Sequence, residues 1–225
     1  MNRPLQSTIS PDFKSIKTYE KGDLRKLLNT ISPSSLSLIL SIHCYSEDLH
    51  PGWLTGGPEH DSINKNFHNL NQLKELYFTW TKIKLPPTDL QCFSAFKNSL
   101  SCISLCGCSV STSVLVALIN YFPKLETLIL GLLSPLDSDE APLSLDPSGR
   151  SLSKLKIDQT GPTHISPGCL GVVEKLSKLG LRFDDICILP PSPDCLTPKL
   201  ANNIVHLFGT NVKCLRLPQI EVKGV

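Results

Sequence analysis

Three cysteines, Cys102, Cys106 and Cys108, lie within a stretch of seven residues and are the first candidates for metal chemistry. A zinc site built on them would need a second closely spaced pair of cysteines, or nearby histidines. The next cysteine along the chain is Cys169. We therefore interpret the three thiols as core and turn residues of one structural unit, and predict neither a metal nor a cofactor for them.

Histidines and carboxylates gather in a second segment, residues 47–68. Its potential metal ligands are Glu47, Asp48, His50, Glu59, His60, Asp61 and His68. Such side chains can bind metals, but spacings of ten and eight residues between the histidines match no rigid ligand arrangement. We predict a solvated loop here. A metal-binding or enzymatic protein that uses this histidine-rich loop is the alternative from a different functional class.

Motifs for phosphate binding or nucleophilic catalysis are missing from the sequence. It contains no Gly-x-x-x-x-Gly-Lys-Ser/Thr, Gly-x-Gly-x-x-Gly or Gly-x-Ser-x-Gly. Gly56-Gly57 is followed by Pro58, which lacks the backbone N–H that a phosphate-binding loop uses. We therefore predict that the protein is not an enzyme and assign no catalytic residues.

The chain instead carries a recurring apolar-x-x-apolar-x-apolar motif. The first residues of five copies are 27, 25, 27 and 24 positions apart, and a sixth copy follows after 36. A period in this range with this core is typical of a leucine-rich repeat. We predict an α/β leucine-rich-repeat solenoid, with parallel strands on a concave side and helices on a convex side. The copies are Leu73/Leu76/Phe78, Leu100/Ile103/Leu105, Leu125/Leu128/Leu130, Leu152/Leu155/Ile157, Leu176/Leu179/Leu181 and Val212/Leu215/Leu217.

The clearest unit spans residues 99–130. It begins with a strand core at 101–105, and a helix follows because apolar residues recur at helical spacing over 114–119. Ser111 or Thr112 is expected to cap this helix. Similar helices are expected at 90–96, 170–176 and 200–208, each ahead of a strand.

The repeats are not uniform along the chain. We predict a flexible lead over 1–12, a degenerate first repeat over 13–43, a long loop or insertion over 44–69, and the repeat array over 70–225. The first repeat is expected to have a helix over 23–31 and a buried strand from Leu36 to Ile42. The proline-rich stretch 131–149 is expected to be a loop. Because no polar capping unit follows the last motif, we expect the chain to be a fragment or to be capped by another element.

Composition indicates where the protein works. The net charge of +2 gives no general attraction to nucleic acid or membranes. The first twelve residues lack the apolar run of a signal peptide, no stretch of 18 apolar residues occurs, and there is no Asn-x-Ser/Thr sequon. With nine irregularly placed cysteines, these features predict an intracellular protein, cytoplasmic or nuclear.

The segment 99–130 resembles the cysteine-containing repeat of F-box/leucine-rich-repeat proteins, with Cys108, Pro123 and Leu125 at matching positions. The likeness covers roughly residues 70–217, and the mixture of regular and degenerate repeats is similar to F-box-like proteins of mushroom-forming fungi. It implies protein recognition, as the substrate-binding part of an F-box-like ubiquitin ligase adaptor. No F-box is found in residues 1–70, so a cullin-type ligase is an expected partner only if an F-box lies upstream. A freestanding scaffold or regulatory repeat protein is the alternative.

A binding face follows from the alternation of side chains along a strand. If the motif leucines point inward, the residues between them face outward. We hypothesise that a basic end of this face binds an acidic segment of a protein partner, with Tyr77 and Trp80 as aromatic anchors at the other end. The alternative is that the basic residues only solvate the strands. The predicted partner-binding residues are Glu75, Tyr77, Trp80, Ser104, Ile129, Lys154, Lys156, Lys178, Arg182 and Arg216.

Overall fold

Two sheets and a layer of helices make up the protein in a computed structural model. It describes residues 8–10, 12, 14–19, 23–45, 48–49, 67–83, 87–135, 151–158, 167–189, 206 and 213–216. Within these described residues, the larger sheet has nine strands and the smaller one has four. The predicted α/β class is therefore confirmed.

The large sheet runs in the order β1-β2-β3-β5-β7-β9-β11-β12-β13, and the small sheet in the order β10-β8-β6-β4. The strands of the large sheet are β1 (Thr8–Ile9), β2 (Ser15–Thr18), β3 (Ser41–Tyr45), β5 (Glu75–Thr79), β7 (Cys102–Cys106), β9 (Thr127–Gly131), β11 (Ser151–Asp158), β12 (Arg182–Leu189) and β13 (Cys214–Arg216). Those of the small sheet are β4 (Asp48–Leu49), β6 (Lys82–Ile83), β8 (Ser109–Val110) and β10 (Ser134–Pro135). The helices are α1 (Asp23–Thr30), α2 (Pro33–Leu36), the 3₁₀ helix η1 (Pro87–Phe96), α5 (Thr112–Tyr121) and α6 (Pro167–Lys178).

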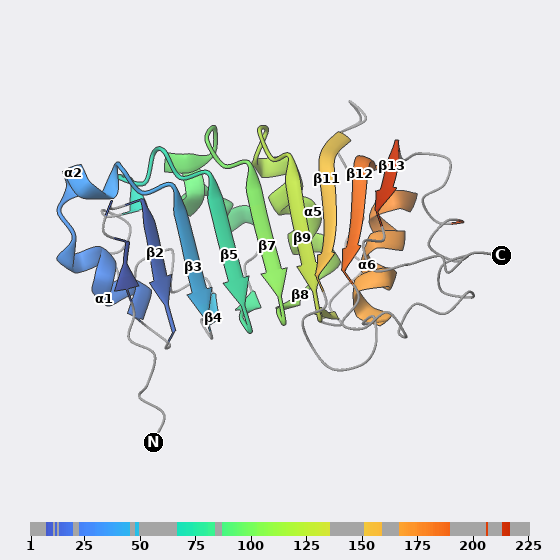
Figure 1. The fold of residues 1–225 in the computed structure, drawn as a ribbon, viewed down its shortest axis with the longest axis horizontal. Coiled ribbons are helices and arrows are strands. Elements are labelled where there is room, and N and C mark those ends of the chain that lie inside the picture. Colours follow the sequence, from blue (N-terminus) through green and yellow to red (C-terminus); the bar gives the residue numbers. More distant parts are fainter. Residues whose placement is uncertain are drawn as a thin grey trace, which may run out of the picture.

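Each strand of the large sheet pairs with the next one in sequence. From β2 to β13 all these pairs are parallel, and only β1 runs antiparallel, along the outer edge of β2. The sheet is neither closed nor curled, and η1, α5 and α6 lie behind it (Figure 1). We call the face opposite these helices the open face, because none of the described helices covers it.

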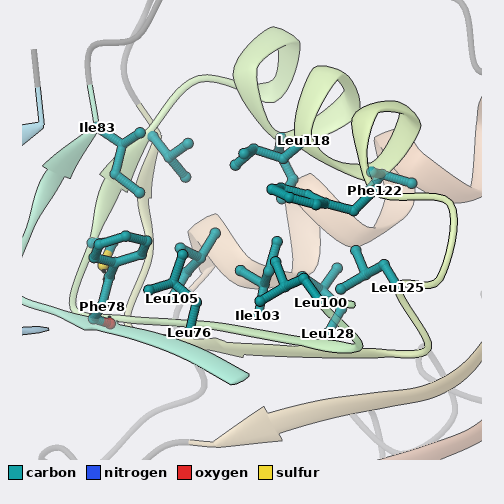
Figure 2. Packing of buried hydrophobic residues seen from close by; sticks show 14 of the residues in the cluster. Leu76, Phe78, Ile83, Leu100, Ile103, Leu105, Leu118, Phe122, Leu125 and Leu128 are labelled. Carbon is teal, nitrogen blue, oxygen red and sulfur yellow. Dashed lines mark hydrogen bonds between the residues drawn. The ribbon is translucent and has the colours of Figure 1, made fainter. Parts of the chain in front are cut away.

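The core lies between the sheet and the helices. Along β5 the side chains alternate, so that Leu76 and Phe78 are buried while Glu75, Tyr77 and Thr79 are partly exposed. The strand residues point toward Leu118 and Phe122 of the α5 region (Figure 2). Full burial of one such aliphatic or aromatic side chain stabilises the fold by about 1.5–3 kcal/mol.

A left-handed residue ends each of three successive strands. Trp80, Gly107 and Leu132 have φ values of 55°, 67° and 47° and directly follow β5, β7 and β9. The turns are hydrogen-bonded in series, because the Trp80 N–H donates to the Cys106 carbonyl and the Gly107 N–H to the Gly131 carbonyl. The chain thus turns in the same way at the same point of each unit, and then enters the small sheet.

Four of the expected helices are present among the described residues, and the one expected over 23–31 is α1. Ser111, one of the two predicted caps, caps α5, because its side chain accepts a hydrogen bond from the Val114 N–H. The helix expected at 90–96 is present as the 3₁₀ helix η1, and the one at 170–176 lies inside α6. Of the helix expected at 200–208, only His206 is described, and it is helical.

The predicted strand from Leu36 to Ile42 is wrong. Leu36 ends the short helix α2, which Ser32 caps, and the strand β3 begins only at Ser41. Ile42 and Cys44 take the inward positions that pair with Leu76 and Phe78. The sequence prediction missed Cys44 because a cysteine replaces the expected aliphatic residue.

The fifth copy of the motif is also misplaced. Leu176 lies in α6, and Leu179 and Leu181 lie in the turn that follows this helix. The residues in register with Leu152, Leu155 and Ile157 are Phe183, Ile186 and Ile188. With this correction the last three copies of the motif begin at Leu152, Phe183 and Val212. Their spacings are 31 and 29 positions (183 − 152 and 212 − 183), whereas the sequence prediction had 24 and 36.

Candidate partner-binding surface

Rows of side chains cross the open face, because the parallel strands are in register. We define the middle row by the residues that pair across the sheet at the level of Tyr77. These are Lys17, His43, Tyr77, Ser104, Ile129, Lys156, Cys187 and Arg216.

Neighbouring rows lie on either side of the middle row. The first row includes Glu75, Cys102, Thr127, Lys154, Asp185 and Cys214, and the third row includes Tyr45, Thr79, Cys106 and Gly131. Most of the predicted residues therefore share this face, namely Glu75, Tyr77, Ser104, Ile129, Lys154, Lys156 and Arg216.

Aromatic side chains gather at the β2–β5 end of the open face. The rings of Tyr19 and Tyr45 are stacked at 5.2 Å between centroids, and those of His43 and Tyr77 at 4.2 Å with an interplanar angle of 1°. Trp80 lies directly after β5. We call these five residues the aromatic patch. They come from three adjacent strands and their ends, so the sheet holds their spacing.

Burial favours the neutral forms of two groups in this patch, the His43 imidazole and the Tyr77 hydroxyl. The pKa of His43 is lowered from 6.5, first by burial and then by the positive charge of Lys17. The pKa of Tyr77 is raised above its ordinary value, mainly by burial, with the Cys102 thiol and the Glu75 carboxylate adding to the shift. The Tyr77 hydroxyl donates a hydrogen bond of 3.2 Å to Glu75 Oε2, which fixes its orientation.

Trp80 is the most exposed member of the patch, with 61% of its surface accessible. Its indole covers Gly107, since a Cβ atom on this glycine would lie only 2.5 Å from Trp80 Cε3. A large aromatic residue with positive φ costs about 1–3 kcal/mol relative to an extended conformation. This strained and exposed position is consistent with a role in binding.

The basic end of the face differs from the prediction. Lys178 is not on the sheet at all but in α6, where it pairs with Glu174 at 2.7 Å. Arg182 is the first residue of β12, level with Ser151 and ahead of the rows. The sequence prediction placed both residues on the open face because it took the end of α6 and the following turn for the strand of the fifth motif.

Carboxylates lie close to two of the three remaining basic residues, Lys156 and Arg216. Lys156 Nζ lies 3.0 Å from Asp158 Oδ2, and Arg216 Nη2 lies 3.1 Å from Asp185 Oδ2. Asp185 is level with Lys154 on the open face. The sequence prediction did not place it there because it assigned the fifth motif to the wrong residues. Two of the three basic residues on β11–β13 are therefore paired with carboxylates, and this end of the open face is not a continuous basic surface.

Small residues form the centre of the face. Ser104 is 4% exposed and its hydroxyl lies 3.5 Å from Cys106 Sγ, while Ile129 is partly exposed. Burial raises the pKa of Cys102 to about 11, so its thiol stays protonated at neutral pH. This region is uncharged and lies between the aromatic patch and the charged side chains of β11, β12 and β13.

Four cysteines are buried, namely Cys44, Cys102, Cys108 and Cys169, whereas Cys214 is exposed. The Cys108 thiol donates a hydrogen bond of 3.3 Å to the Phe78 carbonyl, and burial raises its pKa to about 12. Within the described residues, no group of three or more histidine, cysteine or acidic side chains is arranged to hold a metal ion. The histidine-rich loop 47–68 lies outside the described residues except for 48–49 and 67–68.

Three members of the aromatic patch, Tyr19, His43 and Tyr45, were missed by the sequence prediction. The signal for His43 and Tyr45 was present in the alternation Ser41-Ile42-His43-Cys44-Tyr45, which has two apolar residues facing one way and three polar ones the other. The sequence prediction missed Tyr45 because it began the loop at residue 44, whereas β3 continues to Tyr45.

The chain matches no protein-family model and no curated protein. In the part of the chain that the structure describes, no helix is both long enough and apolar enough to cross a membrane.

Proposed function

We propose that the chain is a leucine-rich-repeat solenoid that recognises a protein partner through its open face. The observation that carries the proposal is a broad sheet face with an aromatic patch, which no described helix covers. Repeat proteins of this kind bind partners on such extended surfaces.

The repeat assignment is supported by the recurrence of one structural step. Strands β5, β7 and β9 are each followed by a left-handed residue and by a short strand of the second sheet. Trp80, Gly107 and Leu132 are 27 and 25 positions apart (107 − 80 and 132 − 107), as are the motifs. This matches a solenoid, in which each unit packs only on its neighbours.

The aromatic patch is the better candidate for the main contact. Tyrosine and tryptophan dominate binding energies at protein interfaces, whereas exposed ion pairs contribute little. Because Lys156 and Arg216 are already paired with carboxylates, an acidic partner would have to compete for them. Lys154, Lys156 and Arg216 then serve as the rim of the interface.

The resemblance to F-box/leucine-rich-repeat proteins suggests a more specific role. In that role the open face selects a substrate for an F-box-like ubiquitin ligase adaptor inside the cell. None of the seven cysteines whose side chains the structure describes forms a disulfide, which supports an intracellular location. A freestanding scaffold uses the same face without a ligase.

Affinity purification with quantitative mass spectrometry tests the proposal. The tagged chain is compared with the double variant Tyr45→Ser/Tyr77→Ser, and with Lys175→Ser, which alters an exposed residue of α6 on the other side of the sheet. We expect specific partners to fall about tenfold or more with the double variant and to stay with Lys175→Ser. Cullin and its linker subunit among the retained proteins support the adaptor, and their absence supports the scaffold. Identical partner profiles for all three proteins would contradict recognition through the open face.

A further inference from the structure

We infer that Ser10 is a phosphorylation site and that a phosphate on it releases β1 from the edge of the large sheet. The inference goes beyond recognition through the open face, and it rests on the proposed function only for an intracellular location, where ATP is present. Two observations carry it, namely the contacts of the Ser10 hydroxyl and the small apolar surface that β1 buries. Pro11, which follows Ser10 in the sequence, points to the class of enzyme that adds the phosphate.

The strand β1 is short and only loosely packed. It consists of Thr8 and Ile9. These residues pair antiparallel with Lys17 and Ile16 of β2. Thr8 is exposed, and Ile9 is partly buried against the core. A segment that buries so little apolar surface opens at a low cost in free energy, so β1 leaves the sheet more readily than the strands whose side chains form the core.

The Ser10 hydroxyl holds the turn that joins β1 to β2. Its oxygen accepts hydrogen bonds from the backbone N–H groups of Lys14 at 3.1 Å and Ser15 at 2.8 Å, and the hydroxyl donates to Asp12 Oδ1 at 2.7 Å. The Ser10 N–H donates to the Ser15 carbonyl at 2.9 Å. A serine hydroxyl has one hydrogen to donate and two lone pairs to accept with. All three are in use in this turn.

A phosphate cannot be added to this hydroxyl without breaking the turn. The phosphorus takes the place of the hydrogen that points at Asp12, so this hydrogen bond is lost and a group of about two negative charges meets the carboxylate. Asp12 is ionised, because the hydrogen bonds from the Ser10 hydroxyl and from the Lys14 N–H lower its pKa. The Lys14 ammonium, 3.8 Å from Asp12 Oδ2, then has two anions to neutralise. Repulsion and lost hydrogen bonds therefore favour the released state of β1.

The same contacts determine when a kinase can act. A serine that precedes proline is the pattern that proline-directed kinases phosphorylate, and they bind their substrates as extended segments. Because the turn engages the Ser10 hydroxyl, the kinase modifies the released form, and the phosphate then keeps it released. The transfer breaks the bond between the γ-phosphorus of ATP and its bridging oxygen and forms the bond from phosphorus to Ser10 Oγ. The hydroxyl proton passes to a base of the kinase, and ADP leaves.

Two other serines among the described residues precede a proline, and neither is released as easily. Ser32 caps α2, whose Leu36 is fully buried. Ser134 follows Leu133, which is 3% exposed. Extending the chain around either serine pulls a buried side chain out of the core, whereas β1 contributes only one partly buried side chain. Of these three serines, Ser10 is therefore the one that a kinase reaches at the lowest cost.

Phosphorylation of the full chain in vitro tests the site. The purified chain is incubated with ATP and each of several recombinant proline-directed kinases, and mass spectrometry maps the phosphate. We expect Ser10 to be modified about tenfold faster than Ser32 and Ser134, or more. Asp12→Ala, which removes the acceptor of the Ser10 hydroxyl, should raise the rate at Ser10 only. A synthetic peptide of residues 4–14, with and without the same change, controls for a direct effect of Asp12 on the kinase.

Amide hydrogen exchange measured by mass spectrometry tests the release. In the chain phosphorylated on Ser10, the amides of β1 and β2 should exchange about tenfold faster or more, and those of β7 should stay unchanged. Ser10→Ala lacks the hydroxyl contacts and cannot be modified, so its β1 amides should exchange faster even before the kinase is added. Ser10→Thr keeps the hydroxyl and should behave like the wild type.

The outcomes are separate from those that test the proposed function. Absence of phosphate on Ser10 with every kinase, or unchanged exchange of β1 and β2 when Ser10 carries phosphate, would overturn the inference. Either result leaves recognition through the open face untouched, because that proposal is decided by Tyr45→Ser/Tyr77→Ser. Conversely, loss of that proposal leaves the turn at Ser10 as it is.

Discussion

Thiol groups on and beneath the open face differ in their surroundings. Cys102 and Cys108 are buried, and burial raises their pKa values to about 11 and about 12. Cys214 is exposed in the short strand β13. Since the thiolate is the reactive form, buried thiols with raised pKa values are slow nucleophiles. Cys102 and Cys108 therefore serve packing, as the sequence led us to expect, whatever the redox state of the solution.

Alkylation with iodoacetamide at pH 7.5 should reveal this difference. An increase in pKa from 9.0 to about 11 lowers the thiolate fraction of Cys102 about a hundredfold relative to an unperturbed thiol. We expect Cys214 to be modified first in the folded chain, and Cys102 at least about a hundredfold more slowly than in urea. Peptide mapping measures both rates, and Cys214→Ser is the control that removes the fast site. Rapid modification of Cys102 in the folded chain would contradict its burial.

His43 should make stability depend on pH. Its pKa in the folded chain is below 6.5 because of burial and of Lys17 on β2, while Glu75 on β5 opposes the shift and Tyr77 is neutral. As the pH falls through 6.5 the unfolded chain takes up a proton first, so stability is complete above this pH and is lost toward the folded-state pKa. We expect urea unfolding at pH 5.5 to show a smaller loss for His43→Phe than for the wild type, each relative to pH 7.5. Equal losses in both proteins would show that other groups cause the dependence.

Elements of secondary structure were predicted well wherever a unit has regular spacing. The strands after Leu73, Leu100, Leu125 and Leu152 were correct because their buried side chains follow the repeat motif. The strand β12 was missed because Leu176 near the end of α6 and Leu179 and Leu181 after it imitate the motif, and helical and strand patterns are hard to separate over six residues. This one error of register moved Lys178 and Arg182 onto the binding face and left Asp185 out.

Glycine substitutions separate the cost of the left-handed turn from the cost of the contact with Trp80. Gly107 has φ +67° and a neighbouring indole, Gly180 has φ +90° and open space, and Gly171 has only open space. We expect Gly107→Ala to lower the free energy of unfolding by about 2 kcal/mol or more, and Gly180→Ala by about 1–2 kcal/mol. Gly171→Ala, in α6, should be neutral or stabilising by about 0.5–1 kcal/mol.

A double variant identifies the contact. Once Trp80→Ala removes the indole, adding Gly107→Ala should cost only about as much as Gly180→Ala in the wild type. Urea unfolding monitored by circular dichroism measures all five proteins. An unchanged cost of Gly107→Ala in the Trp80→Ala background would show that the indole does not lie over this turn.

At the scale of the whole molecule, the described residues share one continuous core that runs across successive copies of the motif. A single cluster of buried side chains runs from Ile16 in β2 to Ile188 in β12. The sequence predicted this composition of leucines and isoleucines, but not the partners of Phe122. Its ring stacks on Phe96 at 6.0 Å and approaches Phe93 at 6.1 Å, both from η1. Contacts between units depend on how the helices pack against the sheet. The spacing of apolar residues within one unit carries no information about that packing.

Phe122→Ala tests how far the core acts as one unit. Removal of a fully buried phenylalanine costs about 3–5 kcal/mol, because the cavity is filled only in part. We expect this loss in one cooperative urea transition, with circular dichroism and amide hydrogen exchange giving the same midpoint. Leu38→Ala, at a position that is 52% exposed, should change stability by less than about 0.5 kcal/mol. Two separate transitions would contradict a continuous core.

The in-register parallel pairing also makes the open face a ruler. Eight strands from β2 to β13 are separated by seven steps, and each step is about 4.8 Å, so the two ends lie roughly 34 Å apart. A ligand long enough to touch both Tyr19 and Arg216 must be at least ten residues long when extended. Gain or loss of one unit during evolution would change this distance by one strand spacing, about 4.8 Å, while leaving the aromatic patch and the charged end intact. The sheet can therefore be adapted to longer or shorter partners without redesign of either contact.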